Sequence, residues 1–306
     1  MTRRPLRNVA ASVHKRLLNL AQSTGRPFNE LVQYYAVERF LFRLSKSRHG
    51  ERFVLKGALM LLVWRAGVTR PTRDINLLGR MSNDLEAIRT VIAEVCRQPV
   101  DDDGLSFDPD SVSTEHIAED ADYEGVRAKF PGRLGNARLA MQVDIGFSDV
   151  ITPEAVRITY PSMLQQPSAE LRAYNRETAI AEKYEAMVKL GELNSRMKDF
   201  FDVWLLAGRF EFDGPTLAKA VRETFARRQT EFTPEPVCFT DRFAHDATKA
   251  AQWNAFVRNA YLKSTVQEFP EIVGRVKAFL QPLVIRIAAN DEVDIHWPPG
   301  GPWRRR

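Results

Sequence analysis

The spacing of apolar and polar positions predicts a pair of helices at the start of the chain. Ser12 can cap a helix that continues to about Ala21, with leucines at helical spacing. After a short loop that contains glycine and proline, Asn29 can cap a longer helix that continues to about Ser45. Apolar side chains recur every three or four residues along this second helix, and the resulting apolar face predicts packing against the first helix.

Farther along, short apolar runs alternate with stretches of helical spacing, which predicts strands interleaved with helices. The predicted strands cover residues 53–55, 74–78, 126–130 and 137–147, and the predicted helices cover 59–65 and 85–96. A turn rich in glycine and proline separates the last two strands, so they predict a hairpin.

From about residue 162 the pattern becomes helical, and a Pro/Gly-rich segment at 298–303 predicts a loosely held tail. The predicted helices cover residues 178–190, 195–206, 216–227 and 247–259. A length of 306 residues suits two moderate domains. We therefore expect an α+β protein, with N-terminal helices and a sheet-containing core over 1–160 and a mostly helical lobe over 161–306.

The charge distribution favours an anionic partner. The net charge is +5 and the isoelectric point is near 9.2. Residues 1–50 hold ten Lys or Arg and two Glu, and the chain ends in three arginines, so both ends are candidates for binding phosphate backbones. Residues 101–124 hold ten acidic residues and no Lys or Arg. We interpret this acidic run as solvated surface.

Other properties exclude several classes of protein. No apolar run approaches the roughly 20 residues needed to cross a bilayer. The basic start of the chain lacks the apolar core of a signal peptide, so we expect a cytoplasmic protein. Cys96 and Cys238 lie far apart and form no CxxC pattern, which argues against a disulfide framework and a zinc site. We interpret both cysteines as packing residues.

Two predicted strands carry acidic residues among apolar ones. In the strand near residue 74, alternation places Thr72, Asp74 and Asn76 on one face. Asp144 lies in a second strand with apolar residues on either side. A lone acid at such a position is usually an edge residue or is salt-bridged, whereas two acids on neighbouring strands are better explained by a shared cation. Gly57, between a strand and a helix, lets the backbone approach a phosphate.

A second group of charges lies in the helical part. Asp199 and Asp202 are one helical turn apart, and Lys183 lies beside the apolar face of an earlier helix. Simpler interpretations stay open. Lys183 can form a surface ion pair with Glu182, and Lys198 can form a salt bridge with Asp202 along one helix face, worth a few tenths of a kcal/mol. Arg196 can merely cap a helix.

Five motifs together resemble the AbiEii/AbiGii-type nucleotidyltransferase toxins of bacterial toxin–antitoxin systems. They lie at residues 56–59, 72–79, 142–147, 182–187 and 194–202. The resemblance spans roughly residues 10–260 and implies a DNA polymerase beta-like nucleotidyltransferase core with a helical second lobe that contributes to the active site. It also implies transfer of a nucleotide from an NTP to RNA, namely the 3' end of tRNA, and growth inhibition unless a cognate antitoxin encoded nearby restrains the toxin.

The resemblance also implies roles for individual residues. Magnesium would be held by Asp74, Asn76 and Asp144, because oxygen ligands are those that Mg²⁺ prefers. The remaining catalytic candidates lie in the second lobe and are Lys183, Asp199 and Asp202. Candidates for binding the nucleotide or RNA are Lys56, Gly57, Ala58, Thr72, Arg196 and Lys198, of which Thr72 can equally be a residue that only favours a strand.

The sequence departs from the family pattern at two positions. Asn76 stands where the family has a second Asp, and Ala58 stands where nucleotidyltransferases often have Ser. A neutral amide binds magnesium more weakly than a carboxylate, so we expect that a second metal ion is not held. Asn76 is either an engineered inactivation or a natural divergence. We therefore weigh an active enzyme against a catalytically silent RNA-binding or regulatory protein, and a third option in which the acceptor is a small molecule or a protein side chain.

Overall fold

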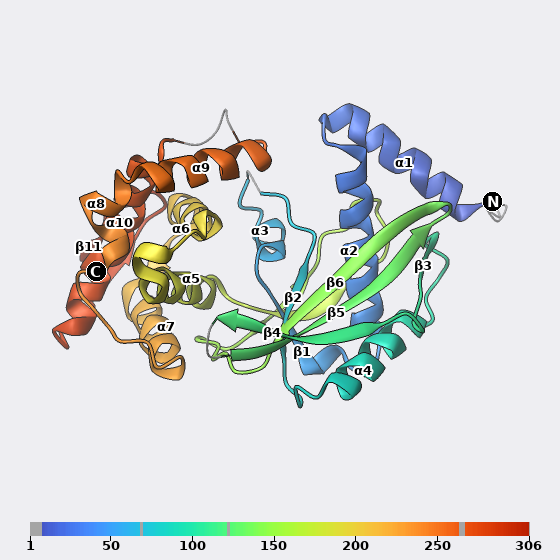
Figure 1. The fold of residues 1–306 in the computed structure, drawn as a ribbon, viewed down its shortest axis with the longest axis horizontal. Coiled ribbons are helices and arrows are strands. Elements are labelled where there is room, and N and C mark those ends of the chain that lie inside the picture. Colours follow the sequence, from blue (N-terminus) through green and yellow to red (C-terminus); the bar gives the residue numbers. More distant parts are fainter. Residues whose placement is uncertain (1–7, 68–69, 121–122, 263–266, 306) are drawn as a thin grey trace. The chain divides into compact units, whose positions relative to one another are not determined.

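The computed structural model describes residues 8–67, 70–120, 123–262 and 267–305. The chain divides into two compact units (Figure 1). Unit 1 contains the residues up to Val63 together with Pro71–Phe147 and Val156–Ala173. Unit 2 contains Trp64–Arg70, Ser148–Ala155 and the chain from Tyr174 onward. These bounds differ from the division at residue 160, which stays a prediction.

Unit 1 combines helices with a mixed sheet, so the α+β class is confirmed for the described residues. Its elements are α1 (Val9–Thr24), α2 (Phe28–Lys46), β1 (Phe53–Lys56), α3 (Leu59–Val63), β2 (Ile75–Gly79), α4 (Leu85–Arg97), β3 (Leu105–Phe107), β4 (Ser113–Asp120), β5 (Tyr123–Leu134), β6 (Ala137–Gly146), β7 (Val156–Thr159) and β8 (Glu170–Ala173).

The sheet of unit 1 has the strand order β3-β5-β6-β2-β1-β8-β7, and β4 also pairs with β5. β2 runs parallel to β6 and β1 runs parallel to β8, whereas the other pairs are antiparallel. The parallel pair of β2 and β6 is the pair that carries Asn76 and Asp144. The sheet topology therefore brings together motifs that are far apart in sequence.

Helices α2 and α4 pack on one face of this sheet (Figure 1). Phe40 of α2 lies 5.8 Å from Phe107 of β3 and 5.1 Å from Phe130 of β5, measured between ring centroids. All three side chains are buried, and burial of a Phe contributes roughly 1.5–3 kcal/mol. Successive residues of a strand alternate between the two faces of the sheet. The polar residues that alternate with the buried apolar residues along each strand therefore project from the opposite face.

Both N-terminal helices were predicted, but their starts differ. Asn8, and not Ser12, caps α1, because its side-chain oxygen accepts a hydrogen bond from the N–H of Ala11 at 2.9 Å. α2 begins directly after Pro27 without a side-chain cap, so Asn29 lies within its first turn. Proline fixes the backbone angle of the residue that precedes this helix, which accounts for a start without a polar cap.

The predicted hairpin is confirmed as β5 and β6, but its turn is shorter than expected. β5 continues to Leu134, and only Gly135 and Asn136 form the turn, with a φ of +57° at Gly135. Pro131 is part of the strand. It lies between the residues of β5 that pair with β4, which end at Lys129, and those that pair with β3, and proline has no N–H to offer a partner.

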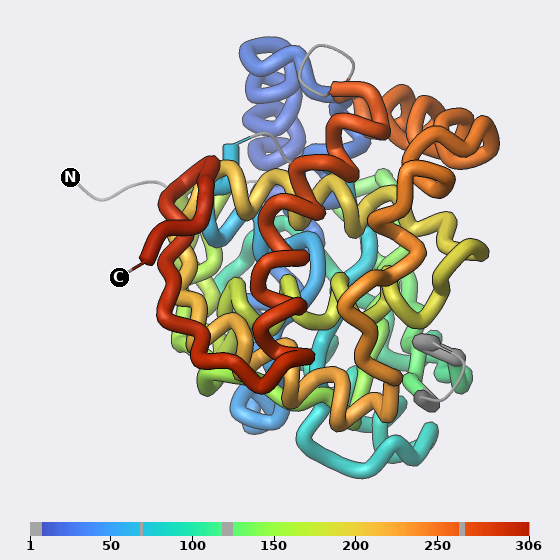
Figure 2. Tube along the Cα trace, turned by 90° about the vertical axis from the view of Figure 1, so that its left-hand side faces the viewer, coloured from blue at the N-terminus to red at the C-terminus, as the bar shows by residue number. Residues whose placement is uncertain are grey.

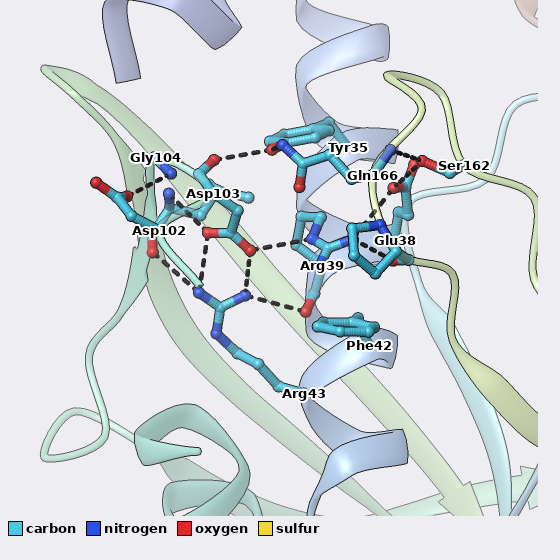
Figure 3. Close-up of polar contacts among 12 residues, drawn as sticks. Tyr35, Glu38, Arg39, Phe42, Arg43, Asp102, Asp103, Gly104, Ser162 and Gln166 are labelled. Carbon is cyan, nitrogen blue, oxygen red and sulfur yellow. Dashed lines mark hydrogen bonds and ion pairs between the residues drawn. The ribbon is translucent and has the colours of Figure 1, made fainter. Parts of the chain in front are cut away.

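The acidic run is not simply solvated surface, because it contains β3 and β4 and one buried carboxylate. Asp103 is 2% exposed and accepts hydrogen bonds from Arg39 at 3.0 Å and from Arg43 at 2.7 and 3.0 Å (Figure 3). Burial acts to raise the pKa of Asp103, but the two guanidinium groups hold that pKa below its ordinary value. The expectation is wrong for this part of the run.

Unit 2 is mostly helical, as predicted, with one small sheet of strand order β11-β10-β9. Its elements are α5 (Arg176–Leu190), α6 (Met197–Arg209), β9 (Phe212–Asp213), α7 (Gly214–Arg227), α8 (Asp241–Ala244), α9 (Ala247–Asn259), α10 (Phe269–Ala288), β10 (Ile295–Trp297) and β11 (Arg304–Arg305). Three short 3-10 turns complete the described chain, at Gly50–Arg52, Gly191–Leu193 and Val237–Phe239.

The Pro/Gly-rich tail is not loosely held. The indole N–H of Trp303 donates to the carbonyl oxygen of Phe279 at 2.7 Å, and the two rings stack with centroids 5.7 Å apart. The N–H of Gly300 donates to the carbonyl oxygen of Ala207 at 2.9 Å. The segment thus folds back onto the helices of unit 2 (Figure 2). The contacts of its aromatic residues hold it in place despite its content of proline and glycine.

Two further expectations concern the core and the membrane. Cys96 and Cys238 are both free and buried, as expected of packing residues. Among the described helices, none has the length and apolar character required to span a bilayer.

Candidate functional site

The turn after β1 brings the backbone of Gly57 against Asn76. Gly57 has a φ of +77°, and a β-carbon added there would lie 3.1 Å from both Cβ and Nδ2 of Asn76. Glycine is therefore required for two reasons, its left-handed backbone angle and the lack of space for a side chain. Lys56 and Ala58, on either side of Gly57, are both buried. The following helix α3 ends at Val63, earlier than predicted.

A row of polar residues crosses the sheet at this point. Adjacent strands pair Lys56 with Asn76, Asn76 with Asp144, Asp144 with Arg127, and Arg127 with Glu115. Directly opposed residues on neighbouring strands project from the same face of a sheet. We call Lys56, Asn76, Asp144, Arg127 and Glu115 the polar row. It projects from the face opposite α2 and α4, since apolar residues alternate with it along the strands.

Asp144 is fully engaged within this row. Its Oδ1 accepts a hydrogen bond from Nε of Arg127 at 2.8 Å, and its Oδ2 accepts from Nη2 of Arg127 at 2.8 Å and from Gln142 at 3.2 Å. The sequence placed Asp144 next to the strand of Asn76, which the pairing confirms. It did not identify Arg127, although the alternation of β5 places residue 127 on the polar face.

Asp74 and Thr72 lie just before β2 and not inside it, since the strand begins at Ile75. Both residues are half-buried. The backbone N–H of Thr72 donates to the hydroxyl of Tyr34 at 3.1 Å, which fixes this segment against α2. The hydrogen bonds from Arg127 to Asp144 raise the pKa of Arg127, and the charge of Asp74 acts in the same direction. Asp74 therefore lies within electrostatic range of the polar row.

The oxygen atoms of Asp74, Asn76 and Asp144 are of the kind that Mg²⁺ binds. Their chemistry fits the ion, but their present arrangement does not offer all of them, because Arg127 holds both oxygens of Asp144. No group of three or more His, Cys, Asp or Glu arranged to hold a metal occurs among the residues the structure describes.

A second cluster of charges lies in unit 2, between α5 and α6. Lys183 of α5 lies 3.0 Å from Asp199 and 2.6 Å from Asp202 of α6. Arg70 donates two hydrogen bonds of 2.9 Å to Asp202, and Arg196 donates one of 2.6 Å to Asp199. We call these five residues the charge cluster. It contains three cations and two carboxylates.

The carboxylates of the charge cluster are almost completely buried. The side chains of Asp199 and Asp202 are each 1% exposed, and that of Lys183 is 15% exposed. Burial on its own would raise the pKa of both acids, but Lys183, Arg196 and Lys198 hold the pKa of Asp199 below its ordinary value. Arg70 and Lys183 do the same for the pKa of Asp202. Burial also acts to lower the pKa of Lys183, yet the two carboxylates raise it. All of these side chains therefore carry charge at neutral pH.

These contacts decide between the interpretations that the sequence left open. The surface ion pair of Lys183 with Glu182 is wrong, because Lys183 binds the aspartates, whereas Glu182 accepts a hydrogen bond from Tyr174 at 2.9 Å. Asp202 pairs with Arg70 and Lys183, whereas the charge of the exposed Lys198 acts on Asp199. Arg196 occupies the N-cap position of α6, but its side chain makes no capping hydrogen bond and donates to Asp199 instead.

Comparison with solved structures gives matches of low identity. JHP933 from Helicobacter pylori is 13% identical, with a TM-score of 0.48, over 86% of this chain and 93% of that chain. The nucleotidyltransferase toxin MenT4 from Mycobacterium tuberculosis is 16% identical, with a TM-score of 0.48, over 92% of this chain and 99% of that chain. No curated protein sequence matches.

The sequence itself matches a known family. The model of the family described as nucleotidyl transferase AbiEii toxin, type IV TA system, matches residues 39–275. This range contains all five motifs, the polar row and the charge cluster, and it covers well over half of the chain. The protein therefore belongs to the AbiEii family of nucleotidyltransferase toxins.

Proposed function

We propose that this protein transfers a nucleotide from an NTP to RNA in a Mg²⁺-dependent reaction, with the 3' end of tRNA as the acceptor. It would act in the cytoplasm as the toxin of a toxin–antitoxin system and inhibit growth unless its cognate antitoxin is present. The observation that carries the proposal is the Gly57 turn packed against Asn76, which faces Asp144 across β2 and β6. Membership of the AbiEii family supports the same reaction.

Residues of unit 1 would bind the reacting end of the nucleotide. The backbone of the Gly57 turn would contact the phosphates, and Lys56 ends the strand that leads into this turn. Asp74, Asn76 and Asp144 would hold Mg²⁺, which supplies positive charge to the phosphates when it is bound. Thr72 and Ala58 flank these groups in sequence and would contribute shape and backbone contacts.

Within unit 2, the cations of the charge cluster would attract an anionic substrate. Lys183, Arg196 and Arg70 gather three cationic groups around the carboxylates of Asp199 and Asp202. Guanidinium and ammonium groups gathered in this way suit the phosphates of a triphosphate or an RNA backbone. Asp199 and Asp202 would hold these cations in place, and the exposed Lys198 would add attraction for an anionic substrate.

Asn76 is the residue that we expect to limit activity, since its amide carries no charge where the family pattern has a carboxylate. A direct test incubates the protein, its Asn76→Asp variant and the Asn76→Asp/Asp74→Ala variant with Mg²⁺, each labelled NTP in turn, and total bacterial RNA. We expect labelled tRNA with Asn76→Asp, and no label once Asp74 is also replaced. Label with neither the original chain nor Asn76→Asp would refute the proposed transfer to RNA.

A catalytically silent RNA-binding protein is the second candidate, and one observation favours it. Both oxygens of Asp144 are held by Arg127 while Asn76 is neutral, which leaves few donors for a metal. This candidate predicts RNA binding that weakens steeply with salt and no turnover even after Asn76→Asp. The basic N-terminal arm that would bind RNA lies partly outside the described residues.

A further inference from the structure

Arg127 makes the most direct contact with Asp144 in the polar row. The two residues face each other across β5 and β6, and the guanidinium presents two parallel N–H groups to the two carboxylate oxygens at 2.8 Å. A planar fork against a carboxylate is a strong form of ion pair. The side chain of Arg127 is 31% exposed, so it has room to leave this position.

A metal ion and this guanidinium would compete for the same atoms. Carboxylate oxygens that accept hydrogen bonds from Arg127 cannot at the same time coordinate a divalent cation along the same lone pairs. Elsewhere in the polar row, Asn76 offers only a neutral amide oxygen. Competition from Arg127 therefore lowers the affinity for a divalent cation more in this chain than it would in a chain with carboxylates at both positions 76 and 144.

We propose that Arg127 is a positioning residue that sets the metal affinity of the site: its guanidinium holds the carboxylate of Asp144 and must release it before a divalent cation can bind. The proposal rests on the function proposed above, in which Asp144 is a metal ligand. It adds that the pair of Arg127 with Asp144 acts as an intramolecular competitor of the ion.

The chain offers a matched control. Lys129 lies two residues farther along β5, on the same face as Arg127, and pairs with Glu115 at 2.6 Å. Lys129→Gln removes one positive charge near the polar row but leaves the contacts of Asp144 intact. Arg127→Gln removes the same charge together with the fork. Arg127→Lys keeps the charge and loses the two parallel hydrogen bonds.

The experiment measures binding of Mn²⁺ alone to the full chain by electron paramagnetic resonance, without nucleotide. Binding that persists in Asp144→Asn is counted as background. We expect Arg127→Gln to tighten Mn²⁺ binding by about fivefold, the order expected from removing a partly exposed charge-assisted pair. Arg127→Lys should give a smaller gain, and Lys129→Gln should change affinity by less than about twofold because its charge is screened by solvent.

Three results would overturn the proposal. These are no gain in affinity with Arg127→Gln, an equal gain with Lys129→Gln, and a gain that persists in Arg127→Gln/Asp144→Asn. Circular dichroism establishes that each variant is folded, and if Arg127→Gln does not fold, a gain or its absence in Arg127→Lys decides. The outcome is separate from nucleotide transfer. If Arg127→Gln tightens Mn²⁺ binding but no RNA is labelled, this inference stands and the proposed function is refuted. If RNA is labelled but Arg127→Gln does not tighten Mn²⁺ binding, the proposed function stands and this inference is refuted.

Discussion

Gly57 lies so close to Asn76 that a β-carbon at position 57 would fall 3.1 Å from the β-carbon of Asn76. This contact links the turn after β1 to the strand that carries the candidate metal ligands. The turn is thereby held at a fixed distance from Asn76, and the two cannot be altered independently.

The Gly57→Ala variant should be less stable and should have lost the proposed activity. A left-handed backbone costs an alanine about 1–2 kcal/mol, and pushing Asn76 aside should cost about 1–3 kcal/mol more. The measurement is the free energy of unfolding in urea. Gly25→Ala is the control, because Gly25 has a similar φ of +69° with nothing within 4 Å of an added β-carbon. Equal losses in the two variants would show that the contact with Asn76 is unimportant.

The Asp103→Asn variant should be strongly destabilised. The substitution leaves Arg39 and Arg43 with an uncharged partner in the interior, and breaking a buried ion pair costs about 3–5 kcal/mol. Guanidinium chloride would screen these charges, so the measurement is urea unfolding. Asp110→Asn is the control, because Asp110 is exposed and its pair with Arg97 should contribute less than about 1 kcal/mol. A loss below that amount for Asp103→Asn would contradict the prediction.

The charge cluster should make stability depend on pH at the acid end. Asp199 and Asp202 have pKa values lowered in the folded state, below the unfolded value of about 3.9. Their contribution is therefore complete above that unfolded value and is lost as the pH falls through the folded pKa. The difference in unfolding free energy between the original protein and Asp202→Asn should be constant from pH 7 to about 5 and shrink below about pH 4. A difference that grows in acid would have the wrong sign.

Lys183 should make the stability of the fold decrease as the pH rises in the alkaline range. Its pKa is raised in the folded state above the unfolded value of about 10.4. Its contribution is therefore present below that unfolded value and is lost as the pH rises through the folded pKa. Thermal melts at pH 8 to 11 of the original protein and of Lys183→Met test this. A stability difference that increases with pH over this range would contradict the assignment.

The Trp303→Ala variant should show that the C-terminal segment stabilises unit 2. It removes a hydrogen bond to Phe279 and a stacked ring, and we expect a loss of about 2 kcal/mol for a half-buried aromatic residue. Differential scanning calorimetry measures the shift in melting temperature. Arg305→Ala, at an exposed position of β11, should leave that temperature nearly unchanged. A loosely held tail would give no shift with either variant.

Elements with a strong apolar period were predictable from the sequence. The helix at 247–259 agrees with α9 at both ends, and the helix at 85–96 agrees with α4 to within one residue. Strands β3, β4, β7 and β8 were missed, because acidic or exposed residues hide their alternation. Helix α10 was not predicted either. Pro282 lies inside it, and proline ordinarily ends a helix.

For the candidate site, the sequence pattern indicated candidate residues and did not indicate the contacts among them. Alternation along each strand indicated that Asn76 and Asp144 carry polar groups to one face. Strand register, which pairs Asp144 with Arg127, depends on tertiary packing that the sequence pattern does not contain. Arg70 likewise gave no signal, because it lies in a loop without periodicity and meets Asp202 only in the folded chain.

The sheet of unit 1 is completed late in the chain. Strand β1 ends at Lys56, but its parallel partner β8 begins at Glu170, more than a hundred residues later. During synthesis on a ribosome, one edge of β1 must therefore wait unpaired while α4 and the β5–β6 hairpin emerge. A nascent chain halted before β8 would expose that edge to other chains, and a chaperone that covers it during this interval would prevent such pairing.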